Sequence, residues 1–453
     1  MPVQNLLLVN PYIHDFSAYD FWMKPLGLLY LASVLNDSGY NISFIDCTDR
    51  FVPEREGIRT KDFPKSKPDG RGKLLREEIP KPKILDHVPK RFSRYGIPIE
   101  SFRNKLASMK NIDAILLTSY MTYWHTGVRE TIMEIRRIFP ETPIILGGIY
   151  ATLMPEHARL FSGANYIATG EGENTILNIL EKVTYQKAPI KRKYLSLDDY
   201  PLPMFSLLSD RSSIPILTAR GCPFKCHYCA SGMIMPSFRR RNPYKVVDEI
   251  EFDYKNYGTS DFAFYDDALL VNSKEHFQVI MDEVIKREIK VSFHMPNAIH
   301  GKYIDEKTAE LMFQGGCRNI RIGLETTDKI RQKESGGKIF SEEFLNAVNN
   351  LNKAGYRKKD IGVYVMMGLP HQKFNEVRNS ILFVNEAGCT IRLVSFTPIP
   401  GTEYWNESLS LKPEIAQDPL LQNNSIFPLS GTEMEIDDFL SLKQMVQELN
   451  AKL

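Results

Sequence analysis

Short apolar runs alternate with stretches of helical spacing through the first part of the chain. Each run ends in polar or turn-forming residues, which is typical of buried parallel strands. The predicted strands are 5–9, 40–46, 113–118, 143–148 and 166–170, and the predicted helices include 25–35 and 131–139. Strands that alternate with helices favour an α/β fold with a doubly wound parallel sheet. We assign residues 1–184 to this first domain.

Polar or glycine residues follow the strands of this predicted sheet. Open parallel sheets bind ligands at the carboxyl ends of their strands, so these residues share one edge. The candidate ligand-binding residues at that edge are Asn10, Ser119, Gly147, Gly148 and Glu171.

A second series of strands and helices follows a linker at 185–212. Its predicted strands are 215–218, 262–265, 290–294, 319–324, 362–367 and 390–394. Each is followed by polar, glycine or proline residues, and most are followed by a helical pattern. This arrangement predicts a partial (β/α)6 barrel of the TIM type over 213–403, with its chemistry on the carboxyl-end loops. A short tail at 404–453 ends in a helix predicted at 435–453.

One stretch interrupts the first domain. Between Glu54 and Arg94 there are 13 Lys and Arg against 7 Asp and Glu, with few apolar residues. Such a stretch is too long for an ordinary connection, so we predict an insert at about 51–105. It is either a solvated loop or a basic cap over the ligand edge that meets an anionic partner.

Composition narrows the setting of the protein. The net charge of +2 gives no field that favours nucleic acid, and the longest apolar stretch is too short to span a bilayer. The first residues show neither a basic region nor a cleavable apolar segment. Of six cysteines, Cys47, Cys317 and Cys389 are scattered, which fits a reducing compartment better than a disulfide framework. We expect a cytoplasmic protein without a transmembrane segment.

The other three cysteines lie together directly after the first barrel strand. Cys222, Cys226 and Cys229 form a C-x3-C-x2-C run. Three thiolates can hold three irons of a four-iron cluster and leave the fourth iron open to a small molecule. Zinc is the alternative, but zinc usually takes two separated ligand pairs, and no second Cys/His pair follows. His227 is adjacent to Cys226, which is a poor geometry for chelation by both.

This loop resembles the signature of radical S-adenosylmethionine enzymes. The resemblance extends to the aromatic Tyr228 just before the last cysteine. It implies that Cys222, Cys226 and Cys229 hold a 4Fe-4S cluster and that Tyr228 contacts adenine. It also implies that S-adenosylmethionine chelates the open iron and is cleaved to a 5′-deoxyadenosyl radical. The electron would come from a donor such as flavodoxin or ferredoxin.

Other strand ends resemble the same family. Asp266 and Asp267 lie where the family receives the methionine ammonium, although they depart from its Gly-Gly-Glu pattern. Glu325 lies where the family meets the ribose or the amino acid moiety. Gly368 and Pro370 belong to a Gly-Leu-Pro turn whose backbone would flank adenine.

Two further residues have open assignments. Arg241, in a run of three arginines, could meet the carboxylate of S-adenosylmethionine or an acidic substrate, or could simply lie on a solvated face. Asn297 could contact the ligand or cap the end of its strand.

The first domain resembles the Rossmann-like domain that binds cobalamin in one subclass of these enzymes. The resemblance rests on 25–32, 146–148 and 170–173. The Asp-x-His-x-x-Gly element that supplies a histidine to cobalt in many cobalamin proteins is absent. The domain could therefore bind cobalamin without that ligand or retain only the fold. His125 is the nearest candidate ligand, and a packed histidine is the alternative.

These resemblances predict a radical S-adenosylmethionine enzyme. The expected reaction is cobalamin-dependent methylation of an unactivated carbon or of phosphorus. The alternatives are hydrogen abstraction with cyclisation or rearrangement, and a metal-binding adaptor without turnover. We expect a small-molecule or peptide substrate, with an anionic substrate as one alternative, and no nucleic-acid partner. The sequence identifies neither the substrate nor the oligomeric state.

Overall fold

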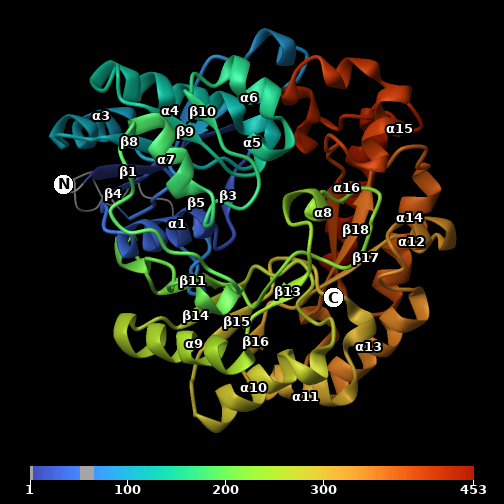
Figure 1. Ribbon diagram of the computed structural model, residues 1–453. Coiled ribbons are helices and arrows are strands. Elements are labelled where there is room, and N and C mark those ends of the chain that lie inside the picture. The colour runs from blue at the N-terminus through green and yellow to red at the C-terminus, as the bar shows by residue number, and fades with distance from the viewer. Residues whose placement is uncertain (1–3, 52–65) are drawn as a thin grey trace. The chain divides into compact units, whose positions relative to one another are not determined.

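The computed structural model describes residues 4–51 and 66–453. The chain divides into two compact units, Met1–Arg211 and Ser212–Leu453, and each is described by itself (Figure 1). Among the described residues no helix is long and apolar enough to cross a membrane.

The first unit is built on a five-stranded parallel sheet. Its strands, in spatial order, are β10 (Tyr166–Ile167), β9 (Ile144–Leu146), β8 (Ala114–Leu117), β1 (Asn5–Asn10) and β4 (Asn41–Asp46). The predicted strands and their parallel pairing are confirmed.

Helices cover both faces of this sheet. Leu6 and Leu8 of β1 pack with α1 (Leu26–Asp37) and α7 (Ile176–Thr184). Leu7 and Val9 point to the opposite face. That face packs against α3 (Ile99–Ser108), α4 (His125–Ile138), α5 (Ile149–Leu153) and α6 (Pro155–Phe161). Side chains alternate between faces along a strand, so one apolar run supplies two cores.

The described part of the predicted insert is folded. Its strands β5 (Gly72–Lys73), β6 (Arg76–Glu78) and β7 (Ser93–Tyr95) form two small antiparallel sheets with β2 (Ile13–Asp15) and β3 (Tyr19–Asp20). A short 3-10 turn spans Lys83–Leu85.

The end of the predicted insert, 51–105, belongs to the core helix α3. Phe102 and Leu106 of α3 are fully buried, and α3 lies in the crossover between β4 and β8. Their spacing of four residues gives the helix its apolar face. Residues 52–65 of the predicted insert lie outside the described residues.

The second unit holds two parallel sheets. The first runs β11 (Ser213–Ile216), β14 (Asp261–Phe264), β15 (Ser292–His294), β16 (Cys317–Arg318), and the second runs β17 (Arg321–Glu325), β18 (Gly362–Met367), β19 (Thr390–Ser395). A parallel bridge between Ile299 and Ile322 connects them. The helices between the strands lie on the outside in Figure 1: α9 (Pro243–Tyr257), α10 (Phe277–Lys286), α11 (Glu306–Gln314), α13 (Ser341–Lys353) and α14 (Phe374–Glu386).

The predicted strand 319–324 differs from the structure. Asn319 adopts a left-handed backbone with φ of 50° and separates β16 from β17. Its side-chain amide lies 2.9 Å from Nδ1 of His294. Asparagine tolerates this conformation better than other residues with a Cβ, which explains the break.

The tail belongs to the second unit. It comprises α15 (Glu403–Leu411), several 3-10 turns and α16 (Ile436–Asn450). The side chain of Asn450 bonds both the backbone N and the backbone O of Ile391, each at 2.9 Å. These two bonds fasten the end of α16 to β19.

Candidate functional site

The cysteine loop has a fixed base. It runs between β12 (Ala219–Arg220) and β13 (Arg239–Arg240), which pair as an antiparallel ladder. At its start, Gly221 has φ of 80°, and a Cβ there would lie 2.5 Å from the carbonyl oxygen of Ser237. Only glycine fits this close approach without a shift of the backbone.

Backbone bonds hold the middle of the loop. The N–H of His227 donates to the carbonyl of Glu334 at 3.1 Å, and the carbonyl of His227 accepts from Tyr404 N at 3.0 Å. The His227 ring lies edge-on to the Tyr404 ring, 5.6 Å between centroids. Its imidazole therefore packs against an aromatic side chain.

The thiols lie at different depths along the loop. Cys226 Sγ donates to the carbonyl oxygen of Ser335 at 2.9 Å, whereas Cys229 is exposed, with Sγ 3.2 Å from the hydroxyl of Ser231. Burial, with a smaller contribution from the nearby Asp267, raises the pKa of the Cys222 thiol to about 11. Thiolates in this loop need a positive charge beside them, which bound iron supplies.

The donor set fits an iron–sulfur cluster better than a single ion. In the described ranges no three His, Cys, Asp or Glu side chains converge closely enough for one metal ion. A four-iron cluster does not need such convergence, because each thiolate binds a different iron. A zinc site would need four converging ligands.

Tyr228 lies against the loop that follows β18. Its ring packs in an apolar cluster that includes Met366 and Leu369. Burial holds the pKa of the Tyr228 hydroxyl well above its usual value, and the charge of Glu325 adds to this effect. The structure thus brings Tyr228 and the predicted adenine-flanking turn together.

That turn is firmly held. Gly368 has φ of 83°, and a Cβ there would lie 3.0 Å from the ring of Phe439 on α16. The carbonyl of Pro370 accepts from the guanidinium of Arg331 at 2.9 Å. The tail therefore supports the loop that the sequence assigns to adenine.

Glu325 forms a buried ion pair that the sequence did not predict. Lys338 Nζ lies 2.5 Å from Glu325 Oε1 and 5.5 Å from the centre of the Tyr228 ring. A Cβ on Gly336 would lie 3.4 Å from Cys226 Sγ, so this segment packs directly on the cysteine loop. The adjacent glycines at 336 and 337, before a lysine, are the pattern that could have indicated this close approach.

Asp266 and Asp267 differ in their surroundings. Asp266 is buried, and its carboxylate accepts from Thr218 Oγ1 at 2.6 Å and from Thr218 N at 3.1 and 3.2 Å. Burial raises the pKa of Asp266 to about 6 although these bonds lower it. Asp267 is exposed and lies near enough to Cys222 to affect its pKa. Asp267 is therefore the more accessible carboxylate of the two.

Asn297 and Arg241 make contacts within the protein. Asn297 Nδ2 donates to the carbonyl oxygens of Tyr265 and Asp266 at 3.0 and 3.4 Å, as a strand cap does. Arg241 is 8% exposed and pairs with the buried Glu249 at 2.5 Å. The structure accounts for both residues in this way, and their contact with a cofactor stays a prediction.

The predicted ligand edge of the first unit is also assembled. Because β1, β8 and β9 are neighbours, Asn10, Ser119, Gly147 and Gly148 follow adjacent strands, and Glu171 follows β10 at the side of the sheet. Ser119 Oγ donates to the Gly147 carbonyl at 2.6 Å. Gly148 has φ of 93°, and a Cβ there would lie 2.3 Å from the backbone oxygen of Ser119.

Two buried polar atoms at this edge fit a polar ligand. Asn10 donates from Nδ2 to Asp46 and Thr48, at 2.7 and 2.9 Å. Asn10 Oδ1 and Thr126 Oγ1 are buried and have no hydrogen-bond partner among the residues described. Leaving such an atom unpaired costs about 1–3 kcal/mol, so a ligand or water that pairs with it is favoured.

His125 lies in an aromatic cluster at the start of α4. Its ring centroid is 4.9 Å from that of His157 and 6.0 Å from that of Tyr150. Its side chain is buried. In the structure, His125 is thus a packed histidine, which was the alternative interpretation. Cobalt ligation by this residue stays a prediction.

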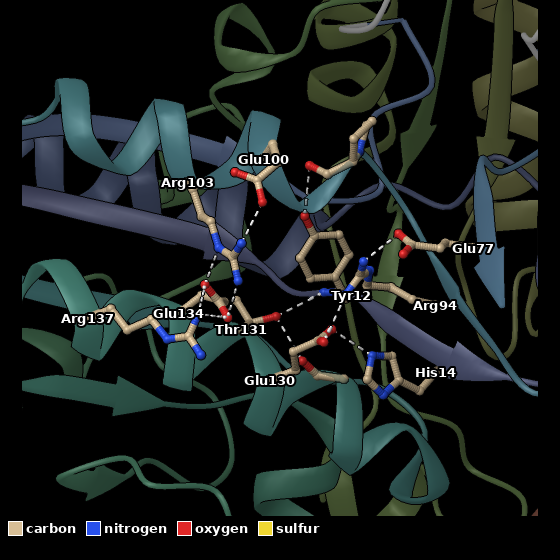
Figure 2. Close-up of polar contacts among 12 residues, drawn as sticks. Tyr12, His14, Glu77, Arg94, Glu100, Arg103, Glu130, Thr131, Glu134 and Arg137 are labelled. Carbon is tan, nitrogen blue, oxygen red and sulfur yellow. Dashed lines mark hydrogen bonds and ion pairs between the residues drawn. The ribbon is translucent and has the colours of Figure 1, made fainter. Parts of the chain in front are cut away.

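A polar network joins the insert to α4 (Figure 2). The carboxylate of Glu130 accepts from His14 Nε2 at 2.9 Å and from Arg94 at 2.8 Å. Arg94 also pairs with Glu77 at 2.5 Å and lies over the ring of Tyr12. Burial raises the pKa of Glu130, but the contacts with His14 and Arg94 outweigh it and hold the pKa below its usual value. Arg94, one of the basic residues of the insert, thus serves the fold.

Two family models match the chain. Residues 216–384 match the Radical SAM superfamily, and residues 94–180 match the B12 binding domain. The first range contains the cysteine loop and most of the barrel. The second contains α3 and the ligand edge at β8, β9 and β10.

Curated proteins resemble the chain at low identity. An uncharacterized methyltransferase of Pyrococcus horikoshii is 23% identical over 340 residues, which are 68% of this chain and 70% of that protein. Bacteriochlorophyllide d C-8(2)-methyltransferase of Chlorobaculum tepidum is 24% identical over 68% of this chain and 71% of its own length. Anaerobic magnesium-protoporphyrin IX monomethyl ester cyclase of Rubrivivax gelatinosus is 24% identical, over 56% of this chain and 51% of its own length.

Solved structures share the fold across nearly the whole chain. The methyltransferase TsrM from Kitasatospora setae, with cobalamin and a 4Fe-4S cluster bound, has a TM-score of 0.65 at 16% identity, covering 92% of this chain and 79% of that one. The cobalamin-dependent enzyme OxsB, with aqua-cobalamin and S-adenosylmethionine bound, has a TM-score of 0.58 at 13% identity, covering 98% and 62%. The predicted fold class is confirmed.

Proposed function

The chain carries a radical SAM domain behind a B12 binding domain, as the sequence predicted, and from this premise we propose that it is a cobalamin-dependent radical S-adenosylmethionine methyltransferase. The observation that carries the proposal is the cysteine loop. Its three thiols follow the first barrel strand, on a loop whose base and middle are fixed by backbone bonds.

A 4Fe-4S cluster held by the cysteine loop would supply the electron that cleaves S-adenosylmethionine, and cobalamin held at the edge of the first sheet would supply a carrier for the methyl group. Cys222, Cys226 and Cys229 hold the cluster. Tyr228 and the turn of Gly368 and Pro370 enclose the adenine, since these elements already pack together.

Charged groups around the loop orient the rest of S-adenosylmethionine. The exposed carboxylate of Asp267 accepts the methionine ammonium, whereas Asp266 holds the strand end through Thr218. Glu325 accepts from the ribose hydroxyls, and Lys338 fixes the position of its carboxylate. Both are buried, which keeps water from competing for these bonds.

The edge formed by Asn10, Ser119, Gly147, Gly148 and Glu171 holds cobalamin. The unpaired Asn10 Oδ1 and Thr126 Oγ1 supply buried polar atoms that a polar ligand satisfies. Gly148 brings the loop after β9 against the end of β8, because any side chain there would displace Ser119.

Methyl transfer is favoured over cyclisation by the extent of the matches. Proteins named as methyltransferases match between 58% and 90% of this chain, and the cyclase of Rubrivivax gelatinosus matches 56%. Hydrogen abstraction with cyclisation therefore remains the second candidate. We place the enzyme in the cytoplasm, with a small-molecule substrate and a flavodoxin or ferredoxin as electron donor.

The test uses anaerobically reconstituted protein with S-adenosylmethionine, cobalamin and dithionite. We expect 5′-deoxyadenosine, cobalamin retained after desalting, and S-adenosylhomocysteine once a substrate is added. Formation of 5′-deoxyadenosine without retained cobalamin would favour the second candidate. An intact cluster with no 5′-deoxyadenosine would favour an adaptor.

A further inference from the structure

The short helix α12 (Lys329–Glu334) ends against the cysteine loop. Its last carbonyl, that of Glu334, accepts from His227 N at 3.1 Å. The next carbonyl, that of Ser335, accepts from the Cys226 thiol at 2.9 Å. The end of α12 is thus hydrogen-bonded directly to the loop that carries the predicted iron ligand Cys226. A molecule that contacts the end of α12 therefore lies close to that ligand.

The outer face of α12 is basic with an apolar residue beside the lysines. Lys329 and Lys333 are exposed and four residues apart, so they lie on the same side of the helix. Between them, Ile330 is 70% exposed. Lys225, also exposed, precedes Cys226 on the cysteine loop. We call Lys225, Lys329, Ile330 and Lys333 the α12 patch.

The positive charge of the α12 patch is carried by lysines that form no ion pair with the described residues. Of the nearby acids, Asp328, Glu334 and Glu376 make other contacts, and Glu407 lines the adjoining cleft. Asp328 caps α12 by accepting from two backbone N–H groups at 3.0 Å. Glu334 accepts from the hydroxyl of Tyr404 at 2.6 Å, and Glu376 pairs with Arg331 at 2.9 Å.

A cleft of about 650 Å³ adjoins the patch. It is lined by residues of α12, of the loop after β18 and of α14, with Glu407 of α15. Ile330 of the patch is among the lining residues, and the charged lining residues are the bases Arg331 and Lys373 and the acids Asp328, Glu334, Glu376 and Glu407. The surface therefore offers a partner a recess as well as a charged rim.

We propose that the α12 patch is the docking surface for a small acidic electron-carrier protein of the flavodoxin type. The inference rests on the proposed function, since a cluster that cleaves S-adenosylmethionine must be reduced by one electron per cleavage. The carrier loses one electron, the cluster gains it, and no atom is transferred. Small electron-transfer interfaces fit an exposed apolar residue within a charged rim, and complementary charge speeds their association.

Binding of oxidised flavodoxin to the full chain tests the proposal. Calorimetry at low and at high salt should give a dissociation constant that rises with salt for the wild type. The double variant Lys329→Glu/Lys333→Glu should bind at least tenfold more weakly at low salt. The matched control is Lys286→Glu/Lys307→Glu, two lysines with side chains 76% and 56% exposed on α10 and α11, which should bind within twofold of the wild type.

Turnover with two reductants supplies the second readout. Dithionite-driven formation of 5′-deoxyadenosine should be unchanged in Lys329→Glu/Lys333→Glu, while flavodoxin-driven formation falls at least tenfold. Wild-type binding by that variant, an equal loss in the control, or no binding by the wild type at low salt would each overturn the proposal. Failure of the wild type with dithionite refutes the proposed function instead, because binding is measured without turnover.

Discussion

Lys338 donates to Glu325 across 2.5 Å, and both side chains are buried beside the cysteine loop. Removing one member of a buried ion pair leaves the other charge without compensation, which costs about 3–5 kcal/mol. We expect Lys338→Met to lower the free energy of unfolding by this amount in urea denaturation. The double variant Glu325→Gln/Lys338→Met should recover most of the loss.

An exposed ion pair provides the matched control. Lys353 pairs with Glu306 at 2.8 Å, with side chains 69% and 68% exposed. Lys353→Met should leave the free energy of unfolding nearly unchanged, because water screens this pair. Equal losses of unfolding free energy for Lys338→Met and Lys353→Met would contradict the prediction that burial makes the first pair more costly to break.

The cysteine assignment is tested by iron content. Cys226→Ala should lose most of the iron of anaerobically reconstituted protein, because a predicted ligand is gone, while circular dichroism stays that of a folded chain. Cys389→Ala removes a buried thiol that lies outside the loop and should keep the iron. Full iron occupancy in Cys226→Ala would refute the ligand assignment.

Asp253 should make stability depend on pH. Burial in α9 and the charge of Glu249 raise its pKa from 3.8 to about 8. The folded protein therefore keeps this proton at pH values where the unfolded chain releases it. The free energy of unfolding should fall from about pH 4 to about pH 8 and level off above, with a slope of at most about 1.4 kcal/mol per pH unit.

The variant Asp253→Asn should flatten this profile. Its free energy of unfolding at pH 8 should exceed that of the wild type, while the two agree near pH 4. Asp248→Asn is the control, since the side chain of Asp248 is 63% exposed on the same helix. Parallel profiles for the wild type and Asp253→Asn would contradict the prediction.

The variant Gly148→Ala tests the proposal that the edge of the first sheet holds cobalamin. In Gly148→Ala the new Cβ would lie 2.3 Å from Ser119 O and 2.5 Å from Ser119 N, so the backbone must move. We expect at least tenfold weaker retention of cobalamin, measured by absorbance after desalting. Gly258 has a comparable φ of 68° with nothing within 4 Å of its Cβ position, so Gly258→Ala should cost about 1 kcal/mol of stability and leave retention unchanged.

Replacing Glu130 should destabilise the protein more than replacing Glu77, although both carboxylates pair with Arg94. Their side chains are 29% and 62% exposed, and Glu130 also accepts from His14. Glu130→Gln should lower the free energy of unfolding by about 2–4 kcal/mol, and Glu77→Gln by less than about 1 kcal/mol. Thermal unfolding of the two variants separates these values, and the reverse order would contradict the network of Figure 2.

Features carried by local pattern could be predicted from the sequence. Apolar runs such as 5–9 indicated the strands because both faces of a parallel strand are buried. The cysteine spacing indicated the loop because ligands of one cluster must lie on one turn. Asn319 divided a predicted strand, since a local backbone conformation is not visible in hydrophobicity.

Features carried by tertiary contacts could not be predicted in this way. Glu130 meets His14 across 116 positions of the chain, and no local pattern marks that pair. Asp266 is a carboxylate at a strand end, as predicted. Only the structure shows that this carboxylate accepts a hydrogen bond from Thr218. Lys338 was missed because its neighbours are a strand end and a distant cysteine loop.

The two backbone bonds of His227 bear on how the protein acquires its iron. Glu334 and Tyr404, from segments far along the chain, hold the centre of the loop through bonds that involve no thiol. We expect the loop to keep its shape when oxygen strips the cluster, in contrast to small metal domains that unfold without their metal. Repair of the enzyme after exposure to air is then a refilling of a standing site rather than a refolding of the chain.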